Sequence, residues 1–362
     1  MTDKVKNIVV TVMFLFFVIL IFFINIIKKD DTISIAERRK LEQLPSFSIS
    51  KLFDGTFFEK FDLYVTDQFV QRQNMRKLKT NVELNIFKKK DYDNLYKYKE
   101  YIIGQTYPLN ESSVQNIADK ITQIKKENLT DENNIYFSIV PDKNYFVNED
   151  NLKLDYNKIE YMLNENLQFA KYINIFNKLQ LSDYYKTDTH WKQENLIKVA
   201  NTIASEMNVK IENEYEQKSI IKFEGAYAGQ LPLKTQEDEI KILTNDVLEN
   251  CKVYNYETKE YTKIYDMSKK DSLDKYDIYL SGAVPLLTIE NDKSESTKEL
   301  LVFRDSYASS LIPLLVSGYK KITVVDTRYI SPKILNEYIN FSNQDILFIY
   351  SILIINNSTS LK

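Results

Sequence analysis

Hydrophobic and polar positions divide the chain into three stretches with different patterns. Residues 7–27 are almost continuously apolar, and residues 28–92 place apolar side chains among many polar ones at helical spacing. From residue 93 onward, strand-like runs alternate with helix-like runs. The three patterns predict an N-terminal membrane helix, a helical segment beside it and a large α/β domain.

The apolar run at residues 7–27 holds about 20 residues without a charge, the length needed to cross ~30 Å of hydrocarbon. A buried core helix would usually carry a polar face, and a cleavable signal peptide would end in small residues. This run instead continues into Ile27, Lys28 and Lys29. The pattern therefore favours an uncleaved signal anchor.

Charges near the anchor do not settle its orientation. Lys4 and Lys6 favour a cytoplasmic N-terminus, whereas Lys28 and Lys29 oppose it. Because an N-terminal anchor usually translocates the chain that follows it, we expect residues 1–6 to be a short cytoplasmic tail and the remainder to be extracytoplasmic.

The second stretch, residues 28–92, is predicted to be a helical juxtamembrane segment. Apolar positions recur broadly at helical spacing, at Phe58, Phe61, Leu63, Val65 and Phe69, and Pro45 interrupts the pattern before them. Such a segment could serve as a stalk that packs on the main domain.

The third stretch, residues 93–362, alternates between predicted strands and helices. Strands are expected at 134–143, 172–179, 299–306, 321–330 and 345–355, and helices at 156–170, 192–207 and 307–319. Several of the strands are almost continuously apolar, which is typical of strands buried on both faces of a parallel sheet. The alternation predicts a doubly wound, mostly parallel sheet with helices on both faces. The stretch around 210–298 is more polar and is expected to be a less regular insertion or a set of long connections.

Composition limits the chemistry that the chain can perform. A formal net charge of -3 gives no indication of a nucleic-acid partner. Cys251 is the only cysteine, so the chain offers neither an internal disulfide nor a thiolate metal cluster. His190 is the only histidine, so a His-rich metal site is excluded and any imidazole acid–base chemistry must use this residue. We expect neither a metal nor a cofactor.

A short loop holds a carboxylate beside the single imidazole. Extended residues i and i+2 face the same side, so Asp188 can reach the ring of His190 and orient it. The alternative is that Asp188 or Thr189 caps the following helix while His190 lies on the surface.

Ser306 directly follows an apolar strand and precedes a predicted helix. This position is the carboxyl end of a central strand, where open α/β sheets bind their ligands, and the helix start offers backbone N–H groups to an oxyanion. The alternative is an ordinary N-cap. Together with the Asp188–His190 pair, the pattern favours a serine nucleophile.

Two motifs resemble a known family. Asp188-Thr189-His190-Trp191 is similar to the signature of the DHHW family, and Arg304-Asp305-Ser306-Tyr307 is similar to its nucleophile block. Further segments resemble the family in the same order, over roughly residues 35–355: SIAERRKLEQLPSFS, FDGTFFEKFDLYVTDQFVQR, SIVPDKNYF and VVDTRYI. The family belongs with the alginate-O-acetyltransferase-like branch of the SGNH hydrolase superfamily, in which Asp and His precede Ser, as they do here.

The resemblance implies a three-layer α/β/α SGNH-hydrolase-like domain after the N-terminal transmembrane helix. It implies that Ser306 is the nucleophile, His190 the base and Asp188 the orienting acid. It also implies substrate or oxyanion contacts, for which the candidates are Arg328, Tyr350 and Trp191. Two positions depart from the family pattern, because Arg304 replaces a glycine and Thr189 replaces a histidine. The sequence shows no convincing counterpart of the glycine and asparagine blocks that complete the SGNH oxyanion hole.

The resemblance also implies a function. Family members typically act beside a membrane-bound O-acyltransferase that supplies acetyl groups, and they place acetyl esters on hydroxyls of an extracellular or cell-wall polysaccharide. A carbohydrate acetylesterase with the same triad is the first alternative, and nothing in the sequence separates it from a transferase. A non-catalytic subunit of a polysaccharide-assembly complex is the second alternative, which the intact Asp–His–Ser set disfavours. The cell membrane, with the catalytic domain outside the cytoplasm, is the expected location.

Overall fold

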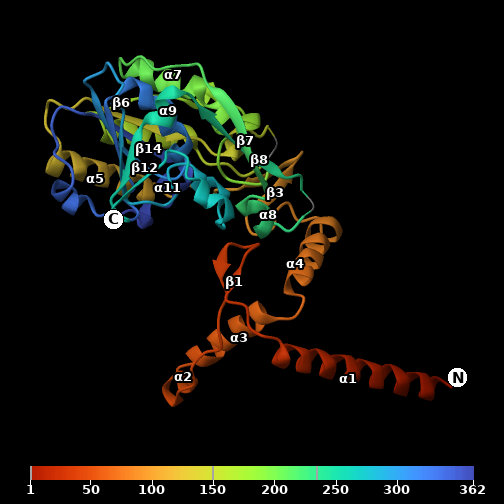
Figure 1. Ribbon diagram of the computed structural model, residues 1–362. Coiled ribbons are helices and arrows are strands. Elements are labelled where there is room, and N and C mark those ends of the chain that lie inside the picture. The colour runs from red at the N-terminus through yellow and green to blue at the C-terminus, as the bar shows by residue number, and fades with distance from the viewer. Residues whose placement is uncertain (1, 149–150, 234) are drawn as a thin grey trace. The chain divides into compact units, whose positions relative to one another are not determined.

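The chain folds as two units in the computed structural model, which describes residues 2–148, 151–233 and 235–362 (Figure 1). The first unit ends at Tyr92 and includes a short later segment that begins at Gly229. The second unit comprises Asp93–Ala228 and the chain from Thr235 to Lys362.

The first unit begins with α1 (Asp3–Ile27), a 25-residue helix that buries none of its side chains. Among the described residues it is the one helix that is long and apolar enough to cross a membrane. Its bounds enclose the predicted span at 7–27, because the helix continues by a turn through the polar residues that precede the apolar run. The predicted N-terminal apolar helix is therefore confirmed.

The rest of the first unit is mostly helical, as its spacing predicts. It contains α2 (Ile49–Phe53), α3 (Thr56–Gln68), α4 (Arg72–Asn81), the π-helical turn η1 (Val82–Ile86) and an antiparallel pair, β1 (Ile33–Ser34) with β2 (Arg39–Lys40). The small β hairpin was not predicted, because two-residue strands leave no periodic signal in the sequence.

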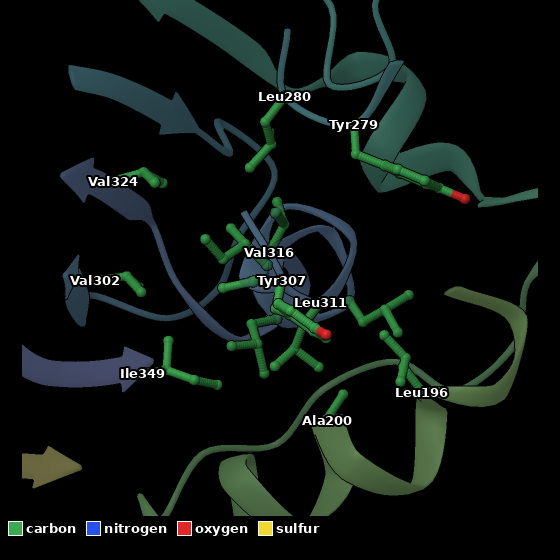
Figure 2. Close-up of a cluster of buried hydrophobic side chains, with 14 of the residues drawn as sticks. Leu196, Ala200, Tyr279, Leu280, Val302, Tyr307, Leu311, Val316, Val324 and Ile349 are labelled. Atoms are coloured by element: carbon green, nitrogen blue, oxygen red, sulfur yellow. The ribbon is translucent and has the colours of Figure 1, made fainter. Parts of the chain in front are cut away.

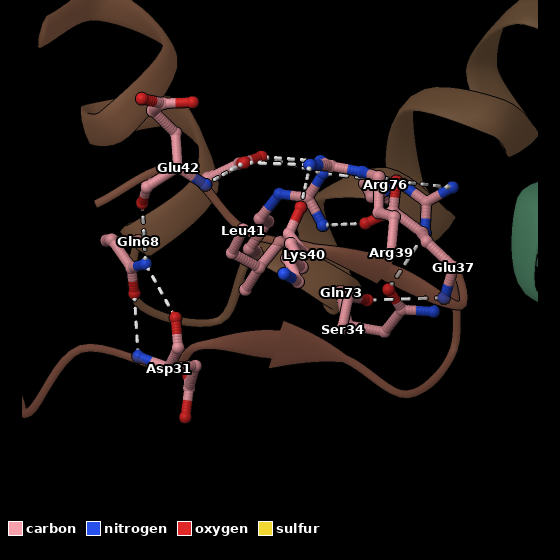
Figure 3. A network of polar contacts seen from close by, with 12 residues as sticks. Asp31, Ser34, Glu37, Arg39, Lys40, Leu41, Glu42, Gln68, Gln73 and Arg76 are labelled. Carbon is pink, nitrogen blue, oxygen red and sulfur yellow. Dashed lines mark hydrogen bonds and ion pairs between the residues drawn. The ribbon is translucent and has the colours of Figure 1, made fainter. Parts of the chain in front are cut away.

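A network of polar contacts holds this hairpin to the end of α3 (Figure 3). The Asp67 carboxylate accepts two hydrogen bonds from Arg39, at 2.8 and 2.5 Å, and one from the backbone N–H of Glu42, at 2.9 Å. The hydrogen bonds from Arg39 lower the pKa of Asp67. Glu37 pairs in turn with Arg72. The carboxyl end of α3 is thus fixed by charged groups rather than by an apolar core.

The second unit is built on one eight-stranded sheet. In order across the sheet, its strands are β10 (Glu260–Thr262), β9 (Lys252–Asn255), β11 (Leu286–Glu290), β13 (Lys321–Val325), β12 (Glu299–Arg304), β14 (Asp345–Ser351), β5 (Ile135–Val140) and β6 (Lys171–Tyr172). The five strands from β13 to β6 are parallel to their neighbours, whereas β11, β9 and β10 pair in antiparallel fashion. The predicted mostly parallel sheet is confirmed.

Alternate residues of the central strand enter separate hydrophobic clusters. Leu300 and Val302 of β12 belong to one cluster, and Leu301 and Phe303 belong to the other. This follows from the two-residue period of a strand, which sends successive side chains to opposite faces. The continuously apolar strand is therefore the middle of three layers.

Helices cover both faces of the sheet. The first cluster (Figure 2) includes residues of α7 (Ile197–Glu206), α10 (Ala308–Leu311) and the 3₁₀ helix η8 (Ile312–Gly318). The second includes residues of α5 (Glu111–Asn128), α6 (Tyr156–Asn166) and α11 (Ile352–Ile355). The three-layer α/β/α arrangement follows.

Shorter elements complete the second unit. Two hairpins lie outside the main sheet, β3 (Leu95–Tyr98) with β4 (Tyr101–Gly104) and β7 (Glu216–Phe223) with β8 (Asp238–Thr244). The remaining helices are α8 (Ala226–Gln230), α9 (Asp246–Asn250), η2 (Lys143–Phe146), η3 (Phe176–Lys178), η4 (Leu181–Asp183), η5 (Gln193–Asn195), η6 (Met267–Asp271), η7 (Lys275–Ile278), η9 (Pro332–Glu337) and η10 (Ser358–Ser360).

Three local predictions differ from the structure. The strand expected at 172–179 pairs only at its start, because the Asn174 side chain accepts from the N–H of Phe176 and begins a 3₁₀ turn. The helix expected at 307–319 is one α-helical turn followed by a 3₁₀ helix that contains Pro313. The strand expected at 345–355 ends at Ser351, whose hydroxyl caps the short helix α11.

The polar stretch at 210–298 is more regular than expected. It supplies β9, β10 and β11, which extend the main sheet on its antiparallel side, as well as the β7–β8 hairpin. Its strands are short, three to eight residues, and most have exposed positions, so their apolar pattern is weak. The description of this stretch as an irregular insertion is corrected accordingly.

Leu311 tests the packing of the first cluster, because its side chain is completely buried there. We expect Leu311→Ala to lower the free energy of unfolding by about 2–5 kcal/mol, the usual cost of a cavity left by a buried leucine. The matched control is Leu273→Ala, since Leu273 is 46% exposed and its truncation should change stability by no more than about 0.5 kcal/mol. Chemical denaturation of the two variants measures the difference, and equal losses would contradict the assigned core.

Candidate active site

Ser306 lies just beyond the carboxyl end of β12, the strand flanked in parallel by β13 and β14. The carboxylate of Asp305 holds the turn at this point, since it accepts from the N–H of Tyr307 at 3.0 Å and from the N–H of Ser351 at 2.8 Å. Asp305 is therefore a turn residue that joins the ends of two strands. Ser306 is half-buried, whereas both of its neighbours are buried.

The loop with Asp188 and His190 folds back on itself opposite this turn. An isolated β-bridge joins Tyr184 to Trp191, and the N–H of Tyr185 donates to the carbonyl of His190 at 3.0 Å. The loop is closed at its base, and His190 lies at this closure.

The three residues form one chain of hydrogen bonds. His190 Nδ1 lies 2.7 Å from Asp188 Oδ1, and His190 Nε2 lies 2.8 Å from Ser306 Oγ. Asp188 Oδ1 also accepts from the backbone N–H of His190, at 3.1 Å. Because an ionised carboxylate only accepts, Nδ1 is the donor, Nε2 is the acceptor and the Ser306 hydroxyl donates to it.

Gly225 and Ala226 support the other side of Asp188. The N–H of Ala226 donates to Asp188 Oδ2 at 3.0 Å, and the N–H of Gly225 donates to the Thr187 hydroxyl at 2.8 Å. A Cβ atom at Gly225 would lie 2.4 Å from the backbone nitrogen of Asp188. Only glycine permits this close approach of the two loops.

Two further charged groups brace the same loop. Lys143 follows the carboxyl end of β5, and its ammonium donates to the carbonyls of Tyr185, at 3.1 Å, and Asp188, at 2.7 Å. Burial lowers the pKa of Lys143 to about 7. Asp238 accepts from the N–H and the hydroxyl of Thr187, at 2.7 and 2.6 Å. The backbone of the loop is therefore held from both sides.

Tyrosine rings enclose the imidazole. The ring of Tyr276 stacks on His190 with a centroid distance of 3.8 Å and an interplanar angle of 7°. The ring of Tyr307 lies 4.9 Å away at 53°, and its hydroxyl donates to the carbonyl of Thr189. Burial raises the pKa of both phenols, so they stay neutral and serve as packing surfaces and hydrogen-bond groups.

The structure places the remaining predicted residues around this centre. Trp191 is fully buried, and its indole N–H donates to the Tyr307 carbonyl at 2.8 Å. Tyr350 is also buried, at the end of β14, with its hydroxyl 3.2 Å from that of Thr327. Arg328 follows β13 and binds Asp326 through two donors, at 2.9 and 2.6 Å. Of these three side chains only that of Arg328 is partly exposed, at 18%.

Arg304, which stands where the family pattern has glycine, is completely buried at the end of β12. Its guanidinium lies 3.3 Å from Asp326 and donates to the carbonyl of Gly282 at 3.1 Å. Asp326 thus pairs with both Arg304 and Arg328. Because a buried charge is costly unless it is paired, this carboxylate accounts for the tolerance of an arginine at the position.

Sequence reasoning missed four of the residues that position the site, namely Lys143, Gly225, Tyr276 and Asp238. Lys143 lies within the segment SIVPDKNYF, which resembles the family, but no role was predicted for this lysine from the sequence. The other three come from the stretch at 210–298, where no motif marks them. Their contacts with the loop arise only from the fold.

This arrangement is suited to covalent acyl chemistry. A hydroxyl that donates to an imidazole, itself oriented by a carboxylate, is the pattern of an activated serine nucleophile. The half-buried position leaves the hydroxyl accessible to a substrate carbonyl.

Solved structures with the same fold are known. A DHHW family protein from Eubacterium siraeum matches with a TM-score of 0.58 and 16% identity, over 74% of this chain and 93% of that chain. Bacillus cereus PatB1 with a sulfonyl adduct matches with a TM-score of 0.54 and 16% identity, over 72% of this chain and 95% of that chain. A second PatB1 structure has a TM-score of 0.50 and 17% identity, over 72% and 96%. No protein-family model and no curated protein sequence matches the chain. The DHHW-like fold expected from the motifs is confirmed at the level of structure.

The single imidazole permits a direct test of the geometry. We expect NMR of its ring nitrogens to show the neutral ring of His190 protonated at Nδ1 and unprotonated at Nε2, because Asp188 accepts at Nδ1. Asp188→Asn should lower the share of this tautomer, because the NH2 group replaces one carboxylate oxygen and cannot accept from whichever donor, of His190 or Ala226, it faces. Asp131→Asn, at an exposed aspartate, is the control and should leave the signals unchanged. A wild-type ring protonated at Nε2 would contradict the assigned hydrogen bonds.

Proposed function

We propose that this chain is a serine-dependent O-acetyltransferase that acts on hydroxyls of an extracellular or cell-wall polysaccharide. The observation that carries the proposal is the chain of hydrogen bonds from Asp188 through His190 to Ser306, at the carboxyl end of a central strand. The two motifs that resemble the DHHW family, and the fold shared with a member of it, support the choice of chemistry.

In the first step, Ser306 Oγ attacks the carbonyl carbon of an acetyl donor. His190 Nε2 takes the hydroxyl proton, and Asp188 stabilises the imidazolium that forms. The tetrahedral intermediate collapses as the donor's leaving group departs with the proton from His190. The product is an acetyl ester on Ser306.

In the second step, an acceptor hydroxyl attacks the acetyl-enzyme. His190 removes the proton of this hydroxyl, a new tetrahedral intermediate forms, and Ser306 leaves and recovers the proton. The net reaction moves one acetyl group from donor to acceptor. The backbone N–H of Ser306 is one candidate for stabilising the oxyanion in both steps.

Arg328 is the best candidate for a substrate contact among the three residues that the family pattern adds. Its side chain is partly exposed, whereas those of Trp191 and Tyr350 are buried. Trp191 acts through its hydrogen bond to the carbonyl of Tyr307, which places it behind the nucleophile turn. Tyr350 is held at the end of β14 by the contact of its hydroxyl with that of Thr327.

The proposed location follows from the apolar helix α1. We propose that residues 1–6 are cytoplasmic, that 7–27 span the cell membrane, and that the SGNH-like domain at 93–362 works outside the cytoplasm after the juxtamembrane segment at 28–92. Because acetyl donors are made inside the cell, an extracytoplasmic transferase needs a supply across the membrane. A membrane-bound O-acyltransferase partner is the proposed source, with polysaccharide as the acceptor.

Activity of the full-length protein in detergent tests the nucleophile. We expect it to release phenol from an activated acetyl ester such as p-nitrophenyl acetate, and to be inactivated by a sulfonyl fluoride that modifies Ser306. Ser306→Ala and His190→Ala should each lower the rate some thousands-fold, because the members of a triad act as a unit. Ser309→Ala is the matched control, since the Ser309 hydroxyl is buried without a hydrogen-bond partner among the described residues.

Acceptors distinguish transfer from hydrolysis. With a glycan oligosaccharide present, a transferase yields acetylated oligosaccharide detectable by mass spectrometry, whereas an esterase yields free acetate with every acceptor tried. If Ser306→Ala and the wild type behave identically, both in this assay and in acetylation of surface glycans in cells, the protein is a non-catalytic subunit instead.

Fractionation tests the anchor. The full-length protein should stay with the membrane fraction after washing with high salt and at alkaline pH, because about 20 apolar residues are removed from water in the bilayer. Protease added outside the cell should reach the catalytic domain. Recovery of a shortened chain free in the medium would show that α1 is a cleaved signal.

A further inference from the structure

The first unit carries an apolar surface that its own fold does not cover. Three phenylalanines around α2 and α3 are strongly exposed: Phe47 at 66%, Phe53 at 85% and Phe58 at 59%. Phe61 is 40% exposed, in the middle of α3. Isolated exposed apolar residues need no explanation, but a contiguous group marks a contact surface.

Phe58 and Phe61 lie on one side of α3 together with other apolar residues. At 100° per residue, Phe57, Phe58, Phe61 and Val65 fall on a single face, which we call the phenylalanine face. Its rings touch one another, with centroids 5.9 Å apart for Phe57 and Phe61, and Phe47 packs on Phe57 at 5.6 Å. The surface is therefore continuous.

Polar residues occupy the opposite side of α3. Glu59 and Thr66 are exposed there, Asp62 is exposed at the edge of the phenylalanine face, and Leu63, 51% exposed, is the one apolar residue among them. The helix is thus amphipathic, yet its apolar face has exposed rings instead of core contacts. This is the pattern of a helix that lies in a membrane interface with its apolar face toward the acyl chains.

Hydrogen bonds attach α3 to the end of the membrane helix. The N–H of Val70 donates to the side chain of Asn25, near the end of α1, at 2.7 Å. Gln68 exchanges two hydrogen bonds with the backbone of Asp31, at 2.9 and 2.8 Å, and the network around Asp67 adds to this junction (Figure 3). Phe61 precedes Gln68 by two turns of helix, or about 10 Å. If α1 spans the bilayer, this part of the phenylalanine face lies within reach of the bilayer surface.

We propose that α2 and α3 lie in the outer interface of the bilayer, with the phenylalanine face turned toward the lipid acyl chains. The inference rests on the proposed anchor. The first unit thus contacts the membrane twice, through α1 across the bilayer and through α2 and α3 along its surface. The juxtamembrane segment is then a membrane-bound platform instead of a stalk that packs on the main domain.

The attraction is apolar and does not depend on anionic lipid. Residues 44–66 contain two lysines, Lys51 and Lys60, against the three acidic residues Asp54, Glu59 and Asp62. A surface with a net negative charge gains nothing from anionic headgroups. Binding should therefore be insensitive to salt.

Tryptophan fluorescence tests the proposal in the full chain. The protein is reconstituted in phosphatidylcholine vesicles with or without bromine on the acyl chains, since brominated chains quench only an indole that contacts them. Phe61→Trp reports on the phenylalanine face and Glu59→Trp on the opposite face. The wild type supplies the background, because its only tryptophan, Trp191, is completely buried.

The expected result is at least a twofold loss of the added emission for Phe61→Trp and no added loss for Glu59→Trp. Neither result should change with salt or with anionic lipid in the vesicles. Val65→Trp and Thr66→Trp repeat the comparison at adjacent positions of opposite faces, so a variant that fails to fold does not decide the outcome.

Other outcomes overturn the proposal. In one of them, the protein still floats with the vesicles while the emission of the added tryptophan in Phe61→Trp and in Val65→Trp is not quenched. This result would mean that the phenylalanine face binds a protein instead of lipid. Equal quenching on both faces would contradict the orientation. Loss of flotation itself would overturn the anchor, and the inference with it, which separates the two failures.

Discussion

A buried carboxylate sets the requirements that the rest of the site meets. Asp188 is 1% exposed, and an unpaired charge at such a position would be strongly destabilising. Three donors satisfy it: the ring and backbone of His190 and the backbone of Ala226. This one carboxylate thereby orients the only imidazole. It also holds the loop that contains Gly225 against the loop that contains Asp188.

The fold brings these parts together through the ends of parallel strands. β5, β12, β13 and β14 end at the same edge of the sheet. Lys143, Ser306 and Arg328 follow the first three of these strands, and the capping residue Ser351 ends β14. Asp305 connects the ends of β12 and β14, and Asp326 pairs with Arg304 at the end of β12 and with Arg328 after β13. Polar groups at this edge hold one another in place, while both faces of the sheet beneath them are apolar. Hydrogen bonds and ion pairs at this edge therefore position the site.

The two units are stabilised in different ways. The second unit has hydrophobic clusters on both sides of its sheet. The first unit joins its helices through charged networks, such as Asp67 with Arg39, and leaves phenylalanines exposed. Such a unit does not gain its stability from a core of its own, and a lipid surface would supply the apolar environment that it lacks.

The sequence by itself determined the apolar helix, the mostly parallel sheet and the three residues of the hydrogen-bonded chain. Nearly continuous apolar runs marked the central strands, and a single histidine in the chain left one choice for the imidazole. Arg328 and Tyr350 were expected from the family resemblance to contact substrate or an oxyanion, and their hydrogen bonds to Asp326 and Thr327 leave this expectation a prediction.

Only the tertiary structure decided what surrounds the imidazole. Tyr276 stacks on His190 from 86 residues away in the sequence, and Asp238 and Gly225 reach the loop from a stretch that looked irregular. Tyrosine and aspartate occur throughout this chain, so neither type stands out locally. Their positions in the site are set by long-range packing of strands and loops, and a local pattern of hydrophobic and polar residues contains no information about such contacts.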